Sequence, residues 1–246
     1  MFYVRMMGVL GGFLLASAYG AAIALVRRDR SLVAHDYARA LVRLIRPAMG
    51  VRVEVEGAER LERASPCIYV ANHQSIFDVP ILAAFYPPNT VVIGKKELRS
   101  IPFFGWLYVR TGNVLIDRSS NPDAVQRLRG AEAAIRERNV SVWIFPEGTR
   151  GEGHGQLLPF KKGAFYMAVA AQAPLVPIVV SPLRRLYDIR GRKITPGTVQ
   201  VRVLKPIETR GLNEQSVPEL IRRTHGAMQH ALDELEGRRP EGRGGG

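Results

Sequence analysis

Residues 1–50 show two helical patterns of different character. The segment Met6–Val26 carries no charged side chain and, as a helix, would extend roughly 31 Å, the thickness of a bilayer core. Apolar side chains then recur at helical spacing up to Gly50, with Arg39, Arg43 and Arg46 between them. The second pattern predicts either a basic amphipathic helix on a membrane surface or an ordinary helix packed on the core, and the apolar neighbour favours the membrane. The two segments would form a spanning helix with an interfacial one, or a re-entrant pair in one leaflet.

The same N-terminal segment has a competing interpretation as a secretory signal peptide, with Arg5 before it and small residues at 16–18 as the cleavage site. Because the apolar run continues past that site and then meets Arg27, Arg28 and Arg30, we favour an uncleaved anchor. Positive charge beside an apolar segment marks the cytoplasmic side of a membrane. We therefore expect the protein at the inner (plasma) membrane of the cell, with its globular part on the cytoplasmic side.

Beyond residue 50 the apolar pattern changes to short strands that alternate with helices. The predicted strands are Val51–Val55, Cys67–Ala71, Thr90–Gly94, Asn113–Ile116, Ser141–Phe145, Leu175–Ser181 and Thr198–Leu204. The predicted helices are Asp78–Phe85, Pro102–Arg110, Pro122–Arg138, Gly163–Ala171 and Val217–Glu236. This alternation is typical of an α/β domain with a mostly parallel central sheet flanked by helices. We predict a membrane anchor (1–50), one α/β domain (51–236) and a disordered Gly- and Arg-rich tail (237–246).

Composition supports a single domain and a polyanionic partner. The 246 residues, 46% of them hydrophobic, provide apolar material for one sizeable core. A formal net charge of +13 indicates nucleic acid, an anionic membrane face or a phosphorylated substrate, without choosing among them. The one cysteine, Cys67, falls inside a predicted strand, which excludes an internal disulfide and a cysteine-rich zinc site.

Polar motifs follow several predicted strands at the point where each strand ends. Asn72 to Asp78 follows one strand, Asp117 and Arg118 follow another, and "PEGTR" at 146–150 follows a third. Ligands of parallel α/β sheets bind beyond the carboxyl ends of the strands. We therefore expect these motifs to converge on one site.

His73 and Asp78 are the candidate catalytic pair. In a strand-to-helix turn the carboxylate can reach one imidazole nitrogen, which fixes the tautomer and leaves the other nitrogen to take a proton. The ordinary alternative is a histidine satisfied by local hydrogen bonds and an aspartate that caps a helix, and an isolated His-x4-Asp favours that alternative. The sequence has no Gly-x-Ser-x-Gly motif, so a substrate hydroxyl is the expected nucleophile of an acyl transfer.

Basic side chains and glycines near these motifs suggest an anion site. Arg118 and Arg150, with Lys161 and Lys162, would surround a bound phosphate. Glycines in the segment 148–155 would let backbone N–H groups approach an anion or a developing oxyanion. Each feature also has an ordinary interpretation, as surface charge or as a flexible connection. The loop matches neither nucleotide-phosphate motif, and the other histidines lack metal-ligand spacing, so we predict no metal.

Four motifs, taken together, resemble one enzyme family. They are "NHQSIFD" (72–78) for N-H-x4-D, "GNVLIDR" (112–118) for G-x-x-F-I-D-R, "FPEGTR" (145–150) and "VPIVV" (176–180). In this order, over roughly residues 65–185, they resemble the 1-acylglycerol-3-phosphate acyltransferases, or lysophosphatidic acid acyltransferases, of phospholipid synthesis. Leu115 replaces an aromatic residue of the second motif, and Gly151 stands where the family often has Ser; both departures are minor.

The resemblance implies transfer of a fatty acyl chain from acyl-CoA or acyl-carrier protein to the sn-2 hydroxyl of lysophosphatidic acid, which yields phosphatidic acid. The thioester is a co-substrate, and no cofactor is implied. Partners would be lysophosphatidic acid, the acyl thioester and membrane lipids, with acyl-carrier protein as one of the two donors. Another acceptor, glycerol-3-phosphate or a different lysolipid, is the alternative within this class. A basic binding module without turnover is the alternative outside it, and nucleic acid is disfavoured because aromatic residues do not interleave with the basic ones.

The resemblance also implies a role for each motif residue. His73 would be the general base and Asp78 its orienting partner. The residues implied to hold the phosphate are Arg118 and Arg150, with Lys95 and Lys161. Those implied to position the acceptor and to help form an oxyanion pocket are Glu147, Gly148 and Thr149.

Overall fold

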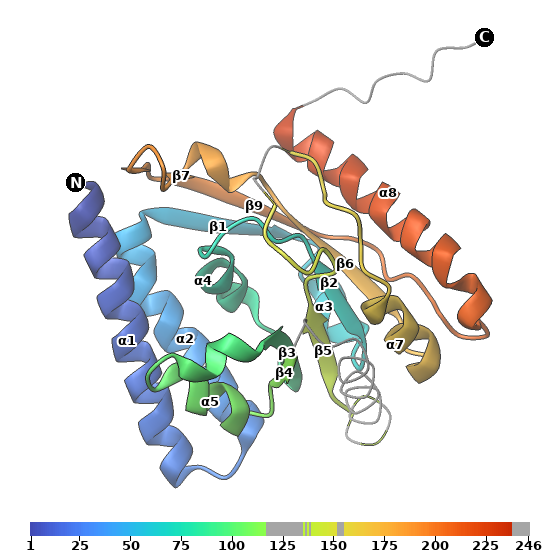
Figure 1. The fold of residues 1–246 in the computed structure, drawn as a ribbon, viewed down its shortest axis with the longest axis horizontal. Coiled ribbons are helices and arrows are strands. Elements are labelled where there is room, and N and C mark those ends of the chain that lie inside the picture. Colours follow the sequence, from blue (N-terminus) through green and yellow to red (C-terminus); the bar gives the residue numbers. More distant parts are fainter. Residues whose placement is uncertain (117–134, 136, 138, 152–154, 238–246) are drawn as a thin grey trace.

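The computed structural model describes residues 1–116, 135, 137, 139–151 and 155–237 (Figure 1). Three predictions fall largely or wholly outside these residues: the helix Pro122–Arg138, the anion-binding role of Arg118, and the tail beyond Gly237. Gly237 itself adopts a left-handed conformation and ends the last helix.

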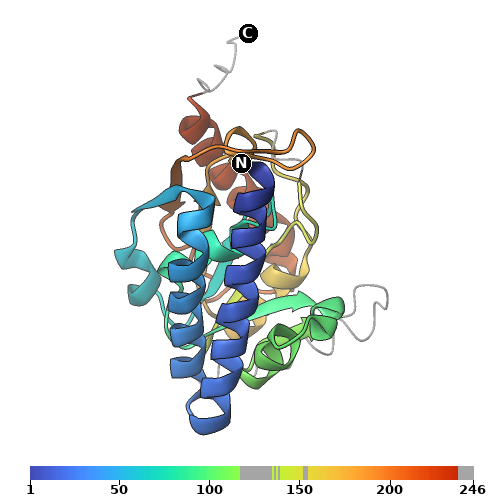
Figure 2. The same cartoon turned by 90° about the vertical axis from the view of Figure 1, so that its left-hand side faces the viewer.

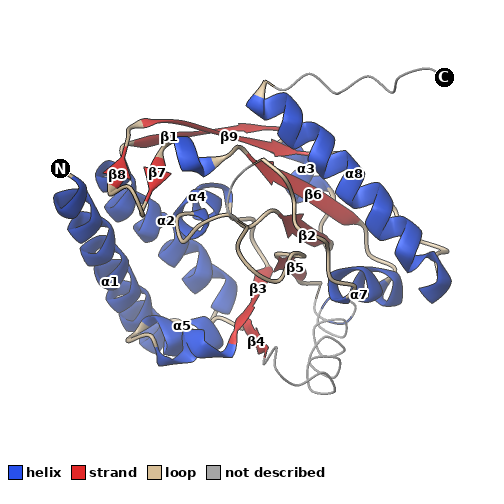
Figure 3. Cartoon of the chain, turned by 45° about the horizontal axis from the view of Figure 1, so that its top comes forward, coloured by secondary structure: helices blue, strands red, loops and turns tan. Residues whose placement is uncertain are grey.

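One sheet of seven strands organises the described chain, in the order β1-β9-β6-β2-β5-β3-β4 (Figure 3). Its strands are β1 (Val51–Glu56), β2 (Ile68–Ala71), β3 (Thr90–Lys95), β4 (Val114–Ile116), β5 (Ser141–Ile144), β6 (Leu175–Val180) and β9 (Gly197–Val203). All neighbouring pairs are parallel except β6 and β9, which pair antiparallel. The mostly parallel sheet is therefore confirmed, and each predicted strand is present with ends displaced by at most one residue.

Helices cover both faces of this sheet. They are α1 (Phe2–Val26), α2 (Arg30–Met49), α3 (Glu59–Arg63), α4 (Asp78–Leu82), α5 (Phe104–Arg110), α7 (Gly163–Ala171) and α8 (Val217–Glu236). Short 3-10 turns are η1 (Ala83–Phe85), η2 (Lys96–Ser100), η3 (Leu183–Arg185) and η4 (Glu214–Ser216), and β7 (Tyr187–Asp188) pairs with β8 (Lys193–Ile194). The bounds of α7 and α8 are those that the sequence predicts, and the helix predicted from Pro102 begins at Phe104.

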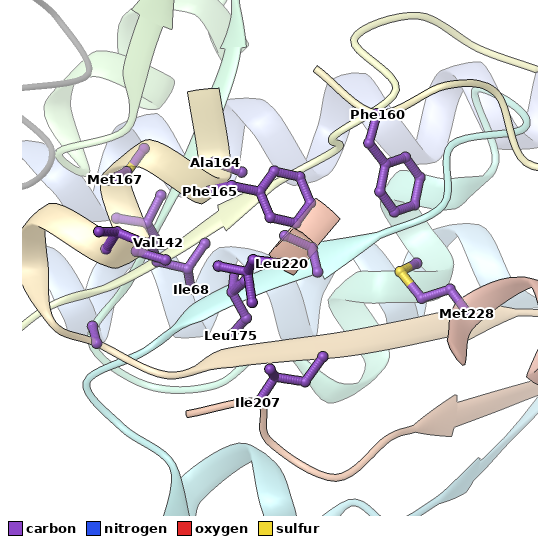
Figure 4. Packing of buried hydrophobic residues seen from close by; sticks show 14 of the residues in the cluster. Ile68, Val142, Phe160, Ala164, Phe165, Met167, Leu175, Ile207, Leu220 and Met228 are labelled. Carbon is purple, nitrogen blue, oxygen red and sulfur yellow. The ribbon is translucent and has the colours of Figure 1, made fainter. Parts of the chain in front are cut away.

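The sheet separates two cores. On one face α7 and α8 cover a cluster in which Phe165, Leu175 and Leu220 lie together (Figure 4). On the other face α1, α2 and α4 cover a cluster that includes Tyr69 and Trp143. Every residue of β2 and β6 is buried, which explains why these strands appear in the sequence as continuous apolar runs.

The N-terminal helices share the second core with the sheet. Small residues allow α1 to approach its neighbours closely: a Cβ on Gly12 would lie 2.9 Å from the Leu44 carbonyl oxygen, and one on Gly20 would lie 2.5 Å from Leu107 of α5. In α2 the apolar stripe, with Leu41 and Ile45, packs inward, so the core-packing interpretation of this helix is correct. Figure 2 shows α1 and α2 side by side along the flank of the domain.

The outer face of α1 remains uncovered by the described chain. Tyr3, Met7 and Leu10 are among its exposed apolar side chains, and they recur at helical spacing. By length and composition α1 is the one described helix that is able to cross a membrane. One side of this helix is thus packed on protein and the other offers a continuous apolar surface.

Candidate active site

The carboxyl ends of β2, β5 and β6 meet at one edge of the sheet because β2 lies between the other two strands. Asn72, directly after β2, joins the end of β6: its Nδ2 donates to the Val180 carbonyl at 3.0 Å, and its Oδ1 accepts from the Val180 amide at 2.8 Å. Gln74 accepts from the Leu183 amide at 3.1 Å and donates to Val180 at 2.9 Å. These bonds hold the chain rigidly on either side of His73.

His73 and Asp78 form the pair that the sequence predicts. The Nδ1 atom of His73 lies 2.6 Å from Oδ2 of Asp78. The His73 side chain is 17% exposed, whereas that of Asp78 is fully buried. Within the described residues no group bonds to Nε2 of His73, so this nitrogen is left to accept a proton. Hydrogen-bonding Nδ1–H to the carboxylate leaves the lone pair on Nε2.

Asp78 also organises its own turn. Its Oδ2 accepts the backbone amides of Gln74 at 2.7 Å and Ser75 at 3.0 Å, and the residue begins α4. The Asp78 carboxylate thus bonds its own turn and also contacts His73, so the two interpretations of the sequence are compatible. Because three donors converge on Oδ2, the carboxylate is fixed in position before a substrate binds.

An aromatic side chain fixes the plane of the imidazole. Phe145, which follows β5, stacks on His73 with ring centroids 4.2 Å apart and planes 19° apart. The ring therefore has one face on Phe145 and its Nδ1 edge on Asp78.

Glu147 cross-links the loops around His73. Its Oε1 accepts the backbone amide of His73 at 2.7 Å, and its Oε2 accepts that of Leu158 at 3.0 Å. The amide of Gly151 donates back to the His73 carbonyl at 2.8 Å. Glu147 is 4% exposed, and burial raises the pKa of its carboxyl, although the two amides oppose the shift. Both carboxylate oxygens thus bond to protein backbone, one of them to that of His73.

Gly148, Thr149 and Arg150 of the "PEGTR" motif follow Glu147 in the same loop. Gly148 has a φ of +70°, and the side chain of Lys161 crosses over it, because a Cβ there would lie 2.7 Å from the lysine Cε. Thr149 and Arg150 are exposed. Arg150 is the chain neighbour of Gly151, whose amide bonds to the His73 carbonyl, so the Arg150 backbone lies close to that of His73. Within the part of the chain that the structure describes, no carboxylate pairs with Arg150 or Lys161.

Lys95 reaches the same edge from the far side of β5. It ends β3, pairs in register with Ile116 of β4, and is exposed. Arg118, two residues after Ile116, lies outside the described residues. The structure therefore brings together His73, Asp78 and the Glu147–Arg150 motif, and it places Lys95 and Lys161 at the same sheet edge. No cluster of three His, Cys, Asp or Glu side chains suited to a metal occurs among the described residues.

Sequence reasoning missed the residues that act by position. Asn72 and Gln74, on either side of His73, bond to Val180 and Leu183, Phe145 stacks on the His73 ring, and Leu158 shares the Glu147 carboxylate. Asn72 and Phe145 sit inside the recognised motifs, which is the signal that identifies them. The amide of Leu158 has no such signal, because any residue supplies a backbone N–H.

Comparison with known proteins agrees with the fold and with the family that the motifs resemble. The family model described as Acyltransferase matches residues 52–181. The human 1-acyl-sn-glycerol-3-phosphate acyltransferase alpha is 36% identical over 244 residues, which cover 99% of this chain and 85% of that protein. The Escherichia coli (strain K12) 1-acyl-sn-glycerol-3-phosphate acyltransferase is 38% identical over 190 residues, which cover 77% and 76%. The crystal structure of the 1-acyl-sn-glycerophosphate (LPA) acyltransferase PlsC from Thermotoga maritima matches with a TM-score of 0.74 and 25% identity, over 98% of this chain and 100% of that one.

These matches identify the chain, with its mostly parallel α/β sheet and His–Asp pair at the carboxyl edge, as an acyl-transfer enzyme. The chain belongs to the acyltransferase family, among the members that are named 1-acylglycerol-3-phosphate acyltransferases. The resemblance inferred from the four sequence motifs is thereby confirmed.

Proposed function

We propose that this protein transfers a fatty acyl chain from a thioester, acyl-CoA or acyl-carrier protein, to the sn-2 hydroxyl of lysophosphatidic acid at a membrane surface. The observation that carries the proposal is the 2.6 Å contact between His73 Nδ1 and Asp78, with no partner on Nε2 among the described residues. Arg150 lies in the loop whose Gly151 amide bonds to the His73 carbonyl, and it pairs with no carboxylate in the described part of the chain. Such a His–Asp pair deprotonates a hydroxyl, and the arginine suits a phosphate on the same substrate.

The reaction follows from these positions. Nε2 of His73 takes the proton of the acceptor hydroxyl as its oxygen attacks the thioester carbonyl, and Asp78 stabilises the imidazolium that forms. Among the described residues the amides of Thr149 and Arg150 donate to no acceptor, which leaves them for the oxyanion of the tetrahedral intermediate. The C–S bond then breaks, the thiolate takes the proton from the imidazolium, and the acyl ester is released. The proposed step uses the thioester as co-substrate and needs no metal or cofactor.

The phosphate site consists of cations from separate elements. Lys161 crosses over Gly148, Arg150 follows two residues later in the same loop, and Lys95 lies at the end of β3. A diffuse set of basic groups suits the phosphomonoester of the acceptor, because guanidinium and ammonium groups bind phosphate through charge-assisted hydrogen bonds.

Membrane association is proposed for the exposed face of α1. Because the opposite face packs on α2 and α5, the helix lies along the domain, which supports insertion into one leaflet over a span across both. Arg27, Arg28 and Arg30 at the end of α1 favour the cytoplasmic side of the inner membrane. The lipid acceptor would then reach the site from the bilayer without crossing water.

The direct test is an assay grid that varies donor and acceptor. Labelled acyl-CoA or acyl-carrier protein is incubated with lysophosphatidic acid, glycerol-3-phosphate or another lysolipid, and the lipid products are separated. Labelled phosphatidic acid is the expected product. If glycerol-3-phosphate were the one acceptor that gave product, the acceptor assignment would be wrong. The absence of product from every combination would contradict acyl transfer.

Arg150→Ala tests the phosphate site. Loss of a charge-assisted bond to phosphate should raise the KM for lysophosphatidic acid about tenfold to hundredfold with kcat little changed. Arg222→Ala is the matched control, since Arg222 is exposed on α8 and pairs there with Glu219. An unchanged acceptor KM with an altered donor KM would move Arg150 to the thioester.

A further inference from the structure

Helix α5 presents an apolar face to solvent. Phe103, the residue before the helix, is 57% exposed, and within the helix Trp106 is 47% and Val109 46% exposed. The spacing of three residues places Trp106 and Val109 on one side of the helix. The opposite side, with Phe104 and Leu107, is buried. We call the three exposed side chains the α5 wedge.

The α5 wedge is held on a rigid support. Phe104 packs against Phe13 of α1 with ring centroids 5.2 Å apart, and Leu107 is buried in a cluster with Ala24 and Val33. On the sheet side, the Tyr108 hydroxyl donates to the Val92 carbonyl of β3 at 3.0 Å. The wedge therefore cannot turn inward without loss of these contacts.

The backbone at Phe103 carries strain. Its φ is +60° and its ψ −49°, a conformation that bulky side chains rarely adopt. A glycine would relieve this strain, and the ring gains little burial in return. An exposed aromatic residue at a strained position is consistent with a contact between that side chain and a partner outside this chain.

The surroundings of the α5 wedge indicate which contact that is. Phe13, which touches Phe104 of α5, belongs to the same helix as the exposed Leu10 and Leu14, so α5 packs directly beside the helix that has the exposed apolar face. The segment 95–110 carries four basic side chains and one acidic side chain, Glu97. An apolar surface bordered by positive charge matches an anionic lipid interface, where aromatic side chains are favoured.

We propose that the α5 wedge inserts into the surface of an anionic bilayer beside α1, as a second anchor that comes from the catalytic domain itself. This proposal rests on the membrane association proposed above. Because α5 is bonded to β3, which ends at Lys95, insertion would set the height of the phosphate-binding edge above the lipid headgroups. The sheet edge would then face the acceptor in the leaflet in one orientation.

Intrinsic fluorescence tests the proposal, because the chain has two tryptophans and Trp143 is buried in the core. Full-length protein is mixed with vesicles of phosphatidylcholine and phosphatidylglycerol, with and without bromine on the acyl chains. Flotation reports binding of the whole protein, and emission reports Trp106. We expect blue-shifted emission that brominated lipid quenches, and loss of both effects in Trp106→Phe.

The outcomes separate the wedge from the α1 anchor. Protein that floats with the vesicles but whose emission is neither shifted nor quenched would overturn the wedge and leave the anchor intact. Failure to float would contradict the membrane association itself and the wedge with it.

A double variant measures how much the wedge contributes. Phe103→Ala with Trp106→Ala should lower vesicle partitioning by roughly tenfold, because apolar area is withdrawn from the bilayer. It should retain turnover of a short-chain, water-soluble lysophosphatidic acid. Tyr166→Ala is the matched control, since Tyr166 is an exposed aromatic of α7 on the other side of the sheet, and its partitioning should equal that of wild type. Equal partitioning of the double variant and the control would refute the proposal.

Discussion

Replacement of Glu147 by glutamine separates a positioning role from direct contact with the acceptor. The two carboxylate oxygens accept the amides of His73 and Leu158, at 2.7 and 3.0 Å. Glutamine offers one oxygen and one NH2 group, so one of these buried amides would face a donor. The unpaired amide costs about 1–3 kcal/mol, and the surviving bond, now to a neutral acceptor, weakens by about 1 kcal/mol. Removing a buried carboxyl whose pKa is raised by burial offsets part of this cost. We therefore expect a net destabilisation of about 1–3 kcal/mol.

The effect on catalysis should appear in kcat. If the His73 backbone moves by a fraction of an ångström to about 1 Å, the proton transfer slows by about tenfold to hundredfold. The acceptor KM should stay near the wild-type value, because Glu147 is buried and contacts protein amides. Steady-state kinetics in mixed micelles, with thermal unfolding measured on the same samples, gives both quantities.

A control separates loss of stability from loss of position. Thr209 is fully buried and its hydroxyl donates to the Ala173 carbonyl at 2.7 Å, at the amino end of β6 and so at the opposite edge of the sheet. Thr209→Val should destabilise the fold by about 1 kcal/mol and leave kcat unchanged. A Glu147→Gln enzyme with wild-type kcat and a raised acceptor KM would refute the positioning role and return Glu147 to the acceptor site.

Two further predictions concern the same loop. Gly148→Ala should lower the free energy of unfolding by about 1–2 kcal/mol, because φ is +70° and the new Cβ meets Lys161, and it should raise the acceptor KM. Gly226→Ala, at a position in α8 with open space around it, should stabilise the fold instead. Unfolding and steady-state kinetics measure both effects. The raised pKa of Glu147 makes the effect of Glu147→Gln depend on pH. As pH rises above about 4.3, the carboxyl loses its proton in the unfolded state before it does so in the folded state, so the wild-type fold becomes less stable. Glutamine does not titrate, so the variant does not undergo this loss. Denaturation at pH 4 and pH 7 should therefore show a larger destabilisation by Glu147→Gln at pH 4, and an equal or smaller one would contradict the shift.

Local patterns were sufficient for most of the fold. The strands β2 and β6 appear as continuous apolar runs because both of their faces are buried. The His73–Asp78 pair could be predicted because Asp78 begins a helix five residues after His73, and one turn of chain brings the two side chains together. Helix α3 was missed because Leu61 is its one buried residue, so that no apolar periodicity marks it.

The long-range geometry could not be predicted from the sequence. Nothing in the sequence says that β5 and β6 flank β2, yet this order is what brings Glu147 to the His73 amide. The "PEGTR" motif identifies an acid near the site but not the direction of its side chain, which follows from the burial of one loop against another. The amphipathic pattern of α2 is equally suited to a membrane and to a core, and the sheet beneath it decides in favour of the core.

The most direct test of the account is the turnover of His73→Ala with acyl-CoA and lysophosphatidic acid, measured on protein whose unfolding temperature matches wild type. If Nε2 of His73 takes the proton of the acceptor hydroxyl, kcat should fall by about a hundredfold to ten-thousandfold while the KM values change little. Turnover within a few-fold of wild type would contradict the general-base role on which the proposed mechanism depends.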